Sequence, residues 1–296
     1  MSIIKLTGLA LASVSALAAG CGPRDTGAPP FECQLEGRAR PVMYVLDGGT
    51  SWIKDKGIFH EDYAGQGPIT LQVRAFLIVH PAGVLLWDTG HSHQLFGGPR
   101  EEAHSDDIRC YAGPPLPEQL AEIGLAPEDV DLLAFSHWHF DHTGNANLFR
   151  NATITGQRDE YEYAFSGLAR RGSWGMTFET YAELEGSDTD VFLGDRDVFG
   201  DGSVRILRVG GHTVGSQVLY VDLAESGPVL LSGDLYHFAE QRERRRVPGF
   251  NVDLDETKRG FQRVERFLEE HPDTELWITH DPVQMTEIPL SPHRHE

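Results

Sequence analysis

Residues 136–144 read SHWHFDHTG, and they place four candidate metal ligands within six positions of the chain. The four are His137, His139, Asp141 and His142. The apolar run before them, residues 131–136, predicts a short buried strand, so the candidate ligands are expected in the loop that follows it. Side chains two positions apart on an extended chain point to the same side, which places His137 and His139 together. Imidazole nitrogens and carboxylate oxygens suit zinc, iron, cobalt or manganese, so this segment predicts a metal site.

One loop cannot complete such a site, and three other predicted strand ends offer further ligands. Gly-Gly-His-Thr follows a strand that ends at Val209, Gly-Asp follows the apolar run 229–232, and Thr-His-Asp follows the run 275–278. The ligands that they add are His212, Asp234 and His280. Loops at strand ends are the usual location of α/β active sites, so we expect these side chains to meet the histidine-rich loop.

The rest of the pattern predicts strands in groups, each followed by a helix and another strand. Runs rich in β-branched and aromatic residues predict strands at residues 42–46, 71–80, 84–88, 131–136, 204–209, 217–222, 229–232 and 275–279. Helices are predicted at residues 116–123, 161–169 and 256–270. The last of these carries Phe261, Val264 and Phe267 on one apolar stripe. This order indicates α/β layers with the helices outside the sheets.

Read in order, these signals resemble the metallo-β-lactamase superfamily. The resemblance rests on H-x-H-x-D-H, then Gly-His-Thr, then Gly-Asp, then a histidine at the end of the last strand, and it runs over roughly residues 42–285. The triplet Asp88-Thr89-Gly90 matches an early turn of that superfamily. The resemblance implies an α/β fold of one type: an αββα sandwich, with two mixed β-sheets flanked by helices.

The resemblance also implies a centre with two divalent metal ions, with zinc expected and iron or cobalt compatible with the same ligands. One metal would be held by His137, His139 and His212. The second would be held by Asp141, His142 and His280. Asp234 would bridge the two ions, and a water or hydroxide between them would attack the substrate.

Within the superfamily, the closer resemblance is to N-acyl-homoserine lactonases. A bridging aspartate such as Asp234 is absent from the true β-lactamases that share this pattern. Residues 157–162 (QRDEYE), 211–217 (GHTVGSQ) and 280–284 (HDPVQ) look like segments of the lactonase family. The resemblance implies a metal-dependent hydrolase that opens a lactone ring, with a small-molecule lactone as its partner.

Three side chains are candidates for proton transfer or hydrogen bonding during that reaction. Asp141 is the expected proton carrier for the leaving alkoxide. The lactonase family often carries a tyrosine three positions after the bridging aspartate, but that position is His237 here, and Tyr236 comes just before it. Either side chain is a candidate donor to the oxyanion.

Other functions stay open at this point. Another dinuclear hydrolase of this fold could act on a thioester, a phosphotriester or a β-lactam. A lipid-anchored metal-binding protein without turnover is a candidate from a different class. The sequence has no G-x-S-x-G segment, so a serine nucleophile of that type has no support.

Composition excludes some classes of function. The chain has 296 residues, of which 40% are hydrophobic and 24% are charged, values typical of a globular protein. It carries 45 acidic against 25 basic residues, a formal net charge of −20. Such a chain repels phosphates at long range, so no nucleic-acid partner is expected.

The N-terminus predicts export rather than a part of the fold. Lys5 is the only charged residue in residues 1–20, the stretch from Leu6 is apolar or small, and the segment ends in LAAG before Cys21. That ending resembles the bacterial lipobox, which implies a lipoprotein signal peptide at 1–20, a lipidated Cys21 as membrane anchor, and a location on the periplasmic or cell-envelope side. Residues 21–40 are rich in glycine and proline and predict a flexible tether, followed by the hydrolase domain at 41–296. A disulfide between Cys33 and Cys110 is chemically allowed there, and two free thiols are the alternative.

Three further features have two interpretations each. Asp88 would orient a metal ligand or stabilise its own turn. His91 and His93 would line the opening to the substrate site or simply be solvated. The basic cluster at residues 242–246 (RERRR) would receive an anionic group or lie in local ion pairs.

Overall fold

The structure is a computed structural model, and it describes residues 40–93, 99–101, 107–172 and 175–296. The predicted signal peptide, Cys21, Cys33 and nearly all of the tether lie outside these residues, so the lipoprotein and disulfide hypotheses stay predictions. Cys110 is buried in a strand. Within the described part of the chain, no helix has the length and apolar character needed to cross a membrane.

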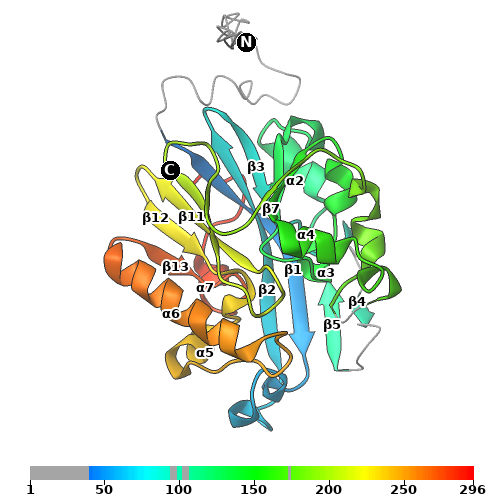
Figure 1. The fold of residues 1–296 in the computed structure, drawn as a ribbon, viewed down its shortest axis with the longest axis vertical. Helices are drawn as coiled ribbons and strands as arrows, with labels where there is room; N and C mark the ends of the chain where they lie inside the picture. Colours follow the sequence, from blue (N-terminus) through cyan, green and yellow to red (C-terminus); the bar gives the residue numbers. More distant parts are fainter. Residues whose placement is uncertain (1–39, 94–98, 102–106, 173–174) are drawn as a thin grey trace, which may run out of the picture.

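Two β-sheets form the centre of the molecule (Figure 1). The first sheet has eight strands in the order β4-β5-β1-β2-β3-β6-β7-β8. Their bounds are β1 Val42–Ile53, β2 Ile69–His80, β3 Gly83–Trp87, β4 Pro99–Glu101, β5 Ile108–Tyr111, β6 Leu132–Ala134, β7 Thr153–Gln157 and β8 Thr189–Phe192. The second sheet has the order β13-β12-β11-β10-β9. Its strands are β9 Arg196–Asp197, β10 Val204–Arg208, β11 Gln217–Leu223, β12 Gly227–Leu231 and β13 Glu275–Trp277.

Both sheets mix parallel and antiparallel neighbours, and helices cover their outer faces. In the first sheet β1 and β2 are antiparallel while β3 and β6 are parallel; in the second, β12 and β13 form the parallel pair. The α-helices are α2 Leu116–Glu122, α3 Phe140–Thr143, α4 Arg158–Ala164, α5 Ala239–Arg244, α6 Leu254–Glu270 and α7 Gln284–Glu287. In Figure 1, α2, α3 and α4 lie on one side of the paired sheets, and α5 and α6 lie on the other. The αββα sandwich of two mixed sheets is therefore confirmed.

Short 3-10 helices connect these elements. They are η1 Lys56–Ile58, η2 Glu61–Tyr63, η4 Pro127–Asp129, η5 Ala146–Phe149, η6 Ala169–Arg171, η7 Phe178–Thr180, η8 Ala182–Leu184 and η9 Gly233–Leu235. Two of them carry residues of the site described below: η1, which follows β1, and η9, which follows β12 directly.

Three separate hydrophobic cores hold the four layers together. Alternate residues of β2 point to opposite faces of the sheet, so Leu77 packs into the core under the α2–α4 side while Phe76 packs between the two sheets. Strand β11 divides in the same way: Leu219 faces the first sheet, and Val218 faces α6. The predicted stripe of α6 is buried in this third core, which explains why the helix lies flat on the second sheet.

Strand β1 extends well past its predicted end at residue 46. A bulge between Asp47 and Gly49 shifts the register, and the strand then continues to Ile53. Gly49 has a φ of +106°, and a Cβ there would lie 2.0 Å from the carbonyl oxygen of Tyr111 in the neighbouring strand. Glycine is therefore required for the bulge, and the continued strand carries Ser51 to the edge of the site described next.

Candidate metal centre

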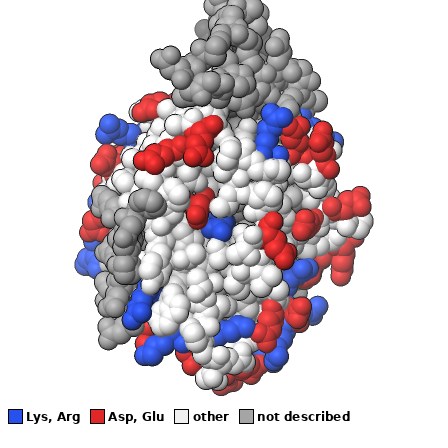
Figure 2. Space-filling model, turned by 180° about the vertical axis from the view of Figure 1, so that it is seen from behind, with Lys and Arg blue, Asp and Glu red and all other residues white. Residues whose placement is uncertain are grey.

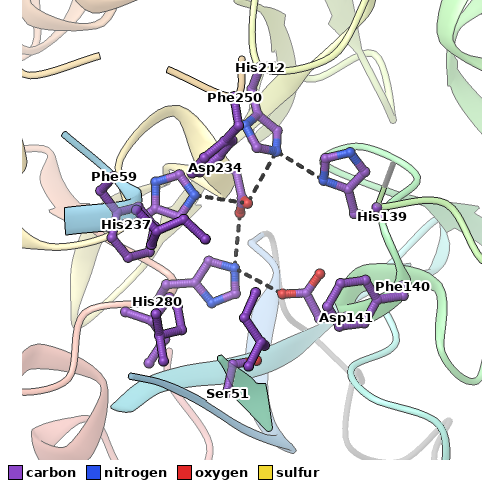
Figure 3. A pocket seen from close by; sticks show the side chains of 15 residues that line it. Ser51, Phe59, His139, Phe140, Asp141, His212, Asp234, His237, Phe250 and His280 are labelled. Carbon is purple, nitrogen blue, oxygen red and sulfur yellow. Dashed lines mark hydrogen bonds and ion pairs between the residues drawn. The ribbon is translucent and has the colours of Figure 1, made fainter. Parts of the chain in front are cut away.

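The structure brings all seven predicted metal ligands together at one edge of the two sheets. Figure 3 shows the five that line the cavity: His139, Asp141, His212, Asp234 and His280. The ligand atoms fall into two groups, and within each group they all lie within 4.8 Å of one another. The first group is His137, His139, His212 and Asp234, and the second is Asp141, His142 and His280. No described residue outside these seven belongs to such a group.

Asp234 lies between the two groups. Its Oδ2 is 3.3 Å from Nε2 of His212, in the first group, and its Oδ1 is 2.9 Å from Nε2 of His280, in the second. Oδ1 is also 3.2 Å from Nε2 of His142. The carboxylate of Asp234 therefore lies where a ligand shared by two metal ions would be expected.

Short loops at strand ends position the ligands. His137 and His139 follow β6, and the turn of α3 directly after them carries Asp141 and His142. His212 lies in the turn between β10 and β11, where its neighbour Gly211 has a φ of +91°. A Cβ on that glycine would lie 2.3 Å from the backbone nitrogen of Thr257, so the loop packs directly on the first turns of α6.

In four of the histidines, Nδ1 faces an oxygen atom and Nε2 is directed to the centre. His280 Nδ1 faces the carbonyl oxygen of Gln72 at 2.6 Å, and His142 Nδ1 faces Asp88 Oδ2 at 2.9 Å. His212 Nδ1 faces Asn251 Oδ1 at 3.0 Å. His137 Nδ1 lies 3.1 Å from the Ser136 hydroxyl. This pattern of outward Nδ1–H and inward Nε2 is typical of metal-binding histidines.

The converging lone pairs fit a metal ion. His212 Nε2 lies 3.1 Å from both His137 Nε2 and His139 Nδ1, although in the uncharged rings these atoms cannot all donate to each other. Asp234 Oδ1 is buried, and apart from its ion pairs with His142 and His280 it has no hydrogen-bond partner among the described residues. A divalent cation would satisfy both the nitrogens and the carboxylate, and imidazole with carboxylate is a ligand set for such ions.

The two groups differ in their charge state. Burial, together with the neighbouring rings, lowers the pKa of His139 to about 3 and that of His137 well below its usual value. Burial also lowers the pKa of His212 to about 4. In the second group, burial would lower the pKa of His142 and of His280, but nearby carboxylates outweigh it and raise both. The histidines of the first group are therefore uncharged at neutral pH, whereas protons compete with a metal ion for the histidines of the second group.

Asp88 and Glu160 support the ligand loops from behind. Asp88 accepts a hydrogen bond from the Ser136 backbone nitrogen at 2.7 Å as well as facing His142, so it both stabilises the loop and orients a ligand. Glu160, buried in α4, accepts from the backbone nitrogens of Trp138 (3.3 Å) and Gly215 (2.7 Å). It thereby ties the loop of His137 and His139 to the loop of His212, and burial raises its pKa to about 7.

A cavity of about 780 Å³, including the part open to solvent, lies against the two groups of ligands. His139, Asp141, His212, Asp234 and His280 form its polar side. The remaining wall is mostly apolar and consists of Ile53, Ile58, Phe59, Leu71, Ile108, Phe140 and Phe250, with Ser51, Gly175 and His237. A polar, metal-binding side that meets an apolar wall suits a ligand with a reactive head and an apolar tail.

The sequence profile of the Metallo-beta-lactamase superfamily matches residues 68–275, which include six of the seven ligands; the seventh, His280, follows shortly after the matched range. This chain belongs to the metallo-β-lactamase superfamily. The curated relative N-acyl homoserine lactonase AttM from Agrobacterium fabrum is 32% identical over 252 residues, which cover 81% of this chain and 93% of that relative.

Solved structures of the superfamily have the same fold. A mutant of AiiA from Bacillus thuringiensis, with N-decanoyl-L-homoserine bound at its active site, superposes with a TM-score of 0.75 at 22% identity, covering 87% of this chain and 100% of that chain. AidC, described as a dizinc quorum-quenching lactonase with a bound product, has a TM-score of 0.61 at 15% identity, covering 82% of this chain and 88% of that chain.

The structure separates the two candidate donors, His237 and Tyr236. His237 lines the cavity, and its Nε2 lies 3.2 Å from Asp234 Oδ2. The hydroxyl of Tyr236 is bonded to Glu265 at 3.0 Å, and its ring stacks on Phe261 beneath α6. Of the two alternatives, the structure therefore favours His237, because successive residues of an extended segment point to opposite sides and His237 is the one directed to the ligands.

The donor role of His237 depends on its protonation. The side-chain oxygen of Gln241 accepts from the His237 backbone nitrogen at 2.8 Å and lies 3.2 Å from Nδ1. The amide nitrogen of Gln241 donates to the Arg246 carbonyl, so its oxygen is an acceptor toward Nδ1. Nε2 faces a second acceptor, Asp234 Oδ2, at 3.2 Å, so either ring nitrogen can carry the proton.

The structure also shows where His91, His93 and the basic cluster at residues 242–246 lie. His91 is buried beside the cavity, 2.9 Å from Ser51, and His93 is bonded to Asn145. Within the basic cluster, Arg242, Arg244 and Arg246 pair with the carboxylates of Glu265, Glu240 and Asp62, which favours the local-pair interpretation. Figure 2 shows basic and acidic side chains interspersed on the face of the molecule opposite to that seen in Figure 1.

Four residues of the site were not predicted from the sequence: Ser51, Phe59, Phe250 and the supporting residue Asn251. Phe59 and Phe250 lie in connections without a regular pattern, and their ring centroids meet at 5.8 Å beside His237. The only available signal for Ser51 was the run Thr50–Ile53, whose residues favour a strand despite the two glycines before it.

Proposed function

We propose that this protein is a metal-dependent lactonase that opens the ring of N-acyl homoserine lactones and so inactivates a bacterial signal. The observation that carries the proposal is the complete set of seven ligands against a cavity with an apolar wall. The relationship to AttM, which is named an N-acyl homoserine lactonase, supports it over most of both chains.

The proposed cofactor is a pair of zinc ions, because the donors present are imidazole nitrogens and carboxylate oxygens. When bound, two such ions would supply a hydroxide at neutral pH and polarise the ester carbonyl. His137, His139 and His212 would hold one ion, Asp141, His142 and His280 the other, and Asp234 both.

Two side chains of this protein are assigned to proton and charge movements. Asp141 has 13% of its side chain exposed, and its Oδ2 lies 3.6 Å from Nε2 of His280. Burial would raise its pKa, but His142 and His280 outweigh it and lower the pKa, so Asp141 is an ionised acceptor that can pass a proton to the leaving alkoxide. His237 can donate to the oxyanion when Nε2 carries the ring proton.

The cavity wall favours this substrate over others of the same reaction class. None of the described residues that line it is a lysine or arginine, so it offers no cation for the carboxylates or phosphates of a charged substrate. The apolar side chains of Ile53, Leu71 and Phe250 match an acyl chain instead. A neutral lactone with an apolar tail therefore fits best.

A substrate panel tests the proposal. Metal-loaded protein is assayed on N-acyl homoserine lactones, a thioester, a phosphotriester and a β-lactam, with Asp234→Asn as the inactive comparison. We expect metal-dependent opening of the homoserine lactones and a loss of at least about 100-fold in the variant. Turnover of another ester class alone would reject the substrate, and no turnover of any compound would favour a binding protein.

We also propose that the protein is exported and anchored through a lipidated Cys21. The support is the apolar segment 1–20 and the LAAGC ending. Expression of the full chain and of Cys21→Ser, followed by membrane fractionation and mass spectrometry of the N-terminal peptide, tests this. We expect a diacylglyceryl mass on the wild-type peptide only; a soluble, unmodified wild-type protein would contradict the anchor.

A further inference from the structure

Ser51 and His91 form a buried pair that the proposed reaction does not use. The Ser51 hydroxyl lies 2.9 Å from Nε2 of His91, and the two residues are 5% and 2% exposed. Ser51 nevertheless lines the cavity, whereas His91 lies behind it. A buried polar pair at a cavity wall is costly unless it has a partner or a purpose.

His91 is held rigidly in this position. Its backbone nitrogen donates to the Gly48 carbonyl at 3.0 Å, and its own carbonyl accepts from the Asn145 side chain at 2.6 Å. Its ring lies nearly parallel to that of Phe140, with centroids 5.7 Å apart. The imidazole therefore cannot turn away from Ser51 without disrupting the loop that carries the metal ligands.

The ring of His91 acts as the acceptor in this pair. Burial lowers its pKa to about 4, so the ring is uncharged at neutral pH and has one N–H. A hydrogen bond to the backbone of Thr50, whose carbonyl can only accept, uses that N–H. Nε2 is then left to accept from the Ser51 hydroxyl, which leaves the Ser51 oxygen as an acceptor toward the cavity.

Ser51 is a polar residue in the mostly apolar wall of the cavity. It is the only polar residue among the described strand residues that line the wall; the others are Ile53 in β1, Leu71 in β2 and Ile108 in β5. Figure 3 shows Ser51 on the same side as Asp141 and His280. The Ser51 oxygen is therefore a polar contact point in the cavity wall on the side of Asp141 and His280.

We propose that the Ser51 oxygen, oriented by His91, accepts a hydrogen bond from the amide N–H of an N-acyl amino lactone and selects such substrates over lactones without that N–H. This inference rests on the proposed lactonase function. It matches the chemistry of that substrate, because the amide lies one carbon from the scissile carbonyl and at the start of the acyl chain. Ser51 is thus a specificity-determining residue, and His91 is a positioning residue.

The test compares two lactones of nearly equal shape. N-hexanoyl-L-homoserine lactone carries the amide N–H, and α-hexanoyloxy-γ-butyrolactone has an ester oxygen in its place. Ser51→Ala should lower kcat/KM for the amide lactone by about 10-fold, mainly through KM, and change the ester lactone by less than about 2-fold. Thr50→Val is the matched control, because Thr50 points to the opposite face of the same strand, and it should not alter the ratio.

A second variant separates the positioning role. His91→Phe frees the Ser51 hydroxyl to rotate, so it should lower the preference for the amide lactone. When it is combined with Ser51→Ala, the preference should be no lower than in Ser51→Ala alone. Equal losses on both lactones, or no loss on either, in Ser51→Ala would overturn the inference. If the metal-loaded wild type opens neither lactone, the proposed function itself fails, and that result is distinct from a failure of this inference.

Discussion

Nδ1 of His142 lies 2.9 Å from Oδ2 of Asp88, and both side chains are buried at the end of β3 and in α3. The carboxylate keeps the proton of His142 on Nδ1 and so turns the lone pair of Nε2 toward the second group of ligands. Asp88 itself has a φ of +60°, a conformation that is strained for a residue with a side chain. The strain is offset by the bonds that this position makes to His142 and to the Ser136 backbone.

Asp88→Asn should weaken the second metal site, because an amide can present its N–H to Nδ1 and reverse the tautomer of His142. We expect a loss of about 10- to 100-fold in affinity for the second ion and little change for the first, as is typical of residues that orient a metal ligand. Competitive titration with a chelator measures both affinities. Asp131→Asn, which alters a carboxylate bonded to the Val84 backbone away from the site, is the control. Equal weakening of both ions would contradict the orienting role.

Metal loading should depend on pH differently at the two sites. The raised pKa values of His142 and His280 mean that protons compete for the second site near neutral pH. At the first site, His139 and His212 take up protons only near pH 3 and 4. On acidification from pH 8 to pH 5, bound metal should fall from about two ions to about one per chain. Elemental analysis after equilibrium dialysis checks this; simultaneous release of both ions would contradict it.

Glu160→Gln should change how stability depends on pH. The pKa of about 7 in the folded protein exceeds the ordinary 4.5, so between these values the folded state holds more protons than the unfolded state, and stability falls as pH rises. The variant loses one of the bonds to Trp138 or Gly215, so it should be less stable than the wild type at pH 5, and the difference should shrink by pH 8. Urea unfolding of the metal-free proteins measures it, with the exposed Glu162→Gln as control. A constant difference across this range would refute the prediction.

His237→Ala and Tyr236→Phe form a matched pair of neighbours. The first should lower kcat by about 100-fold with both metals retained, as expected when one oxyanion donor is removed. The second removes only the bond from Tyr236 to Glu265, so it should cost about 1 kcal/mol of stability and leave kcat unchanged. Initial rates at saturating lactone, with metal analysis of each protein, decide between them. A larger loss of activity in Tyr236→Phe than in His237→Ala would instead assign the role of oxyanion donor to Tyr236.

The layers and the ligands could be predicted from sequence because both depend on local signals. Buried strands give continuous apolar runs, as at residues 75–79 (AFLIV), and the amphipathic stripe of α6 shows its period directly. The ligand side chains follow strand ends, and the order of the strands then brings them to one edge. The order of the strands is thus what brings His280 close to Asp141, although 139 positions separate them in the sequence.

The cavity wall could not be predicted in the same way. The glycines at positions 48 and 49 look like the end of a strand, yet a bulge carries β1 on to Ser51 and Ile53. Tyr236 and His237 are adjacent, and which of them faces the site depends on the backbone of η9 and on the bond to Gln241. Such choices come from tertiary packing rather than from local propensity.

The most direct measurement is catalytic activity during stepwise addition of zinc to metal-free protein, with N-hexanoyl-L-homoserine lactone as substrate and ring opening followed by proton release. If the seven side chains form a dinuclear hydrolytic centre, activity should rise until about two zinc ions are bound per chain and then reach a plateau. A protein that binds two ions and leaves the lactone intact, or that is fully active without metal, would contradict the central claim.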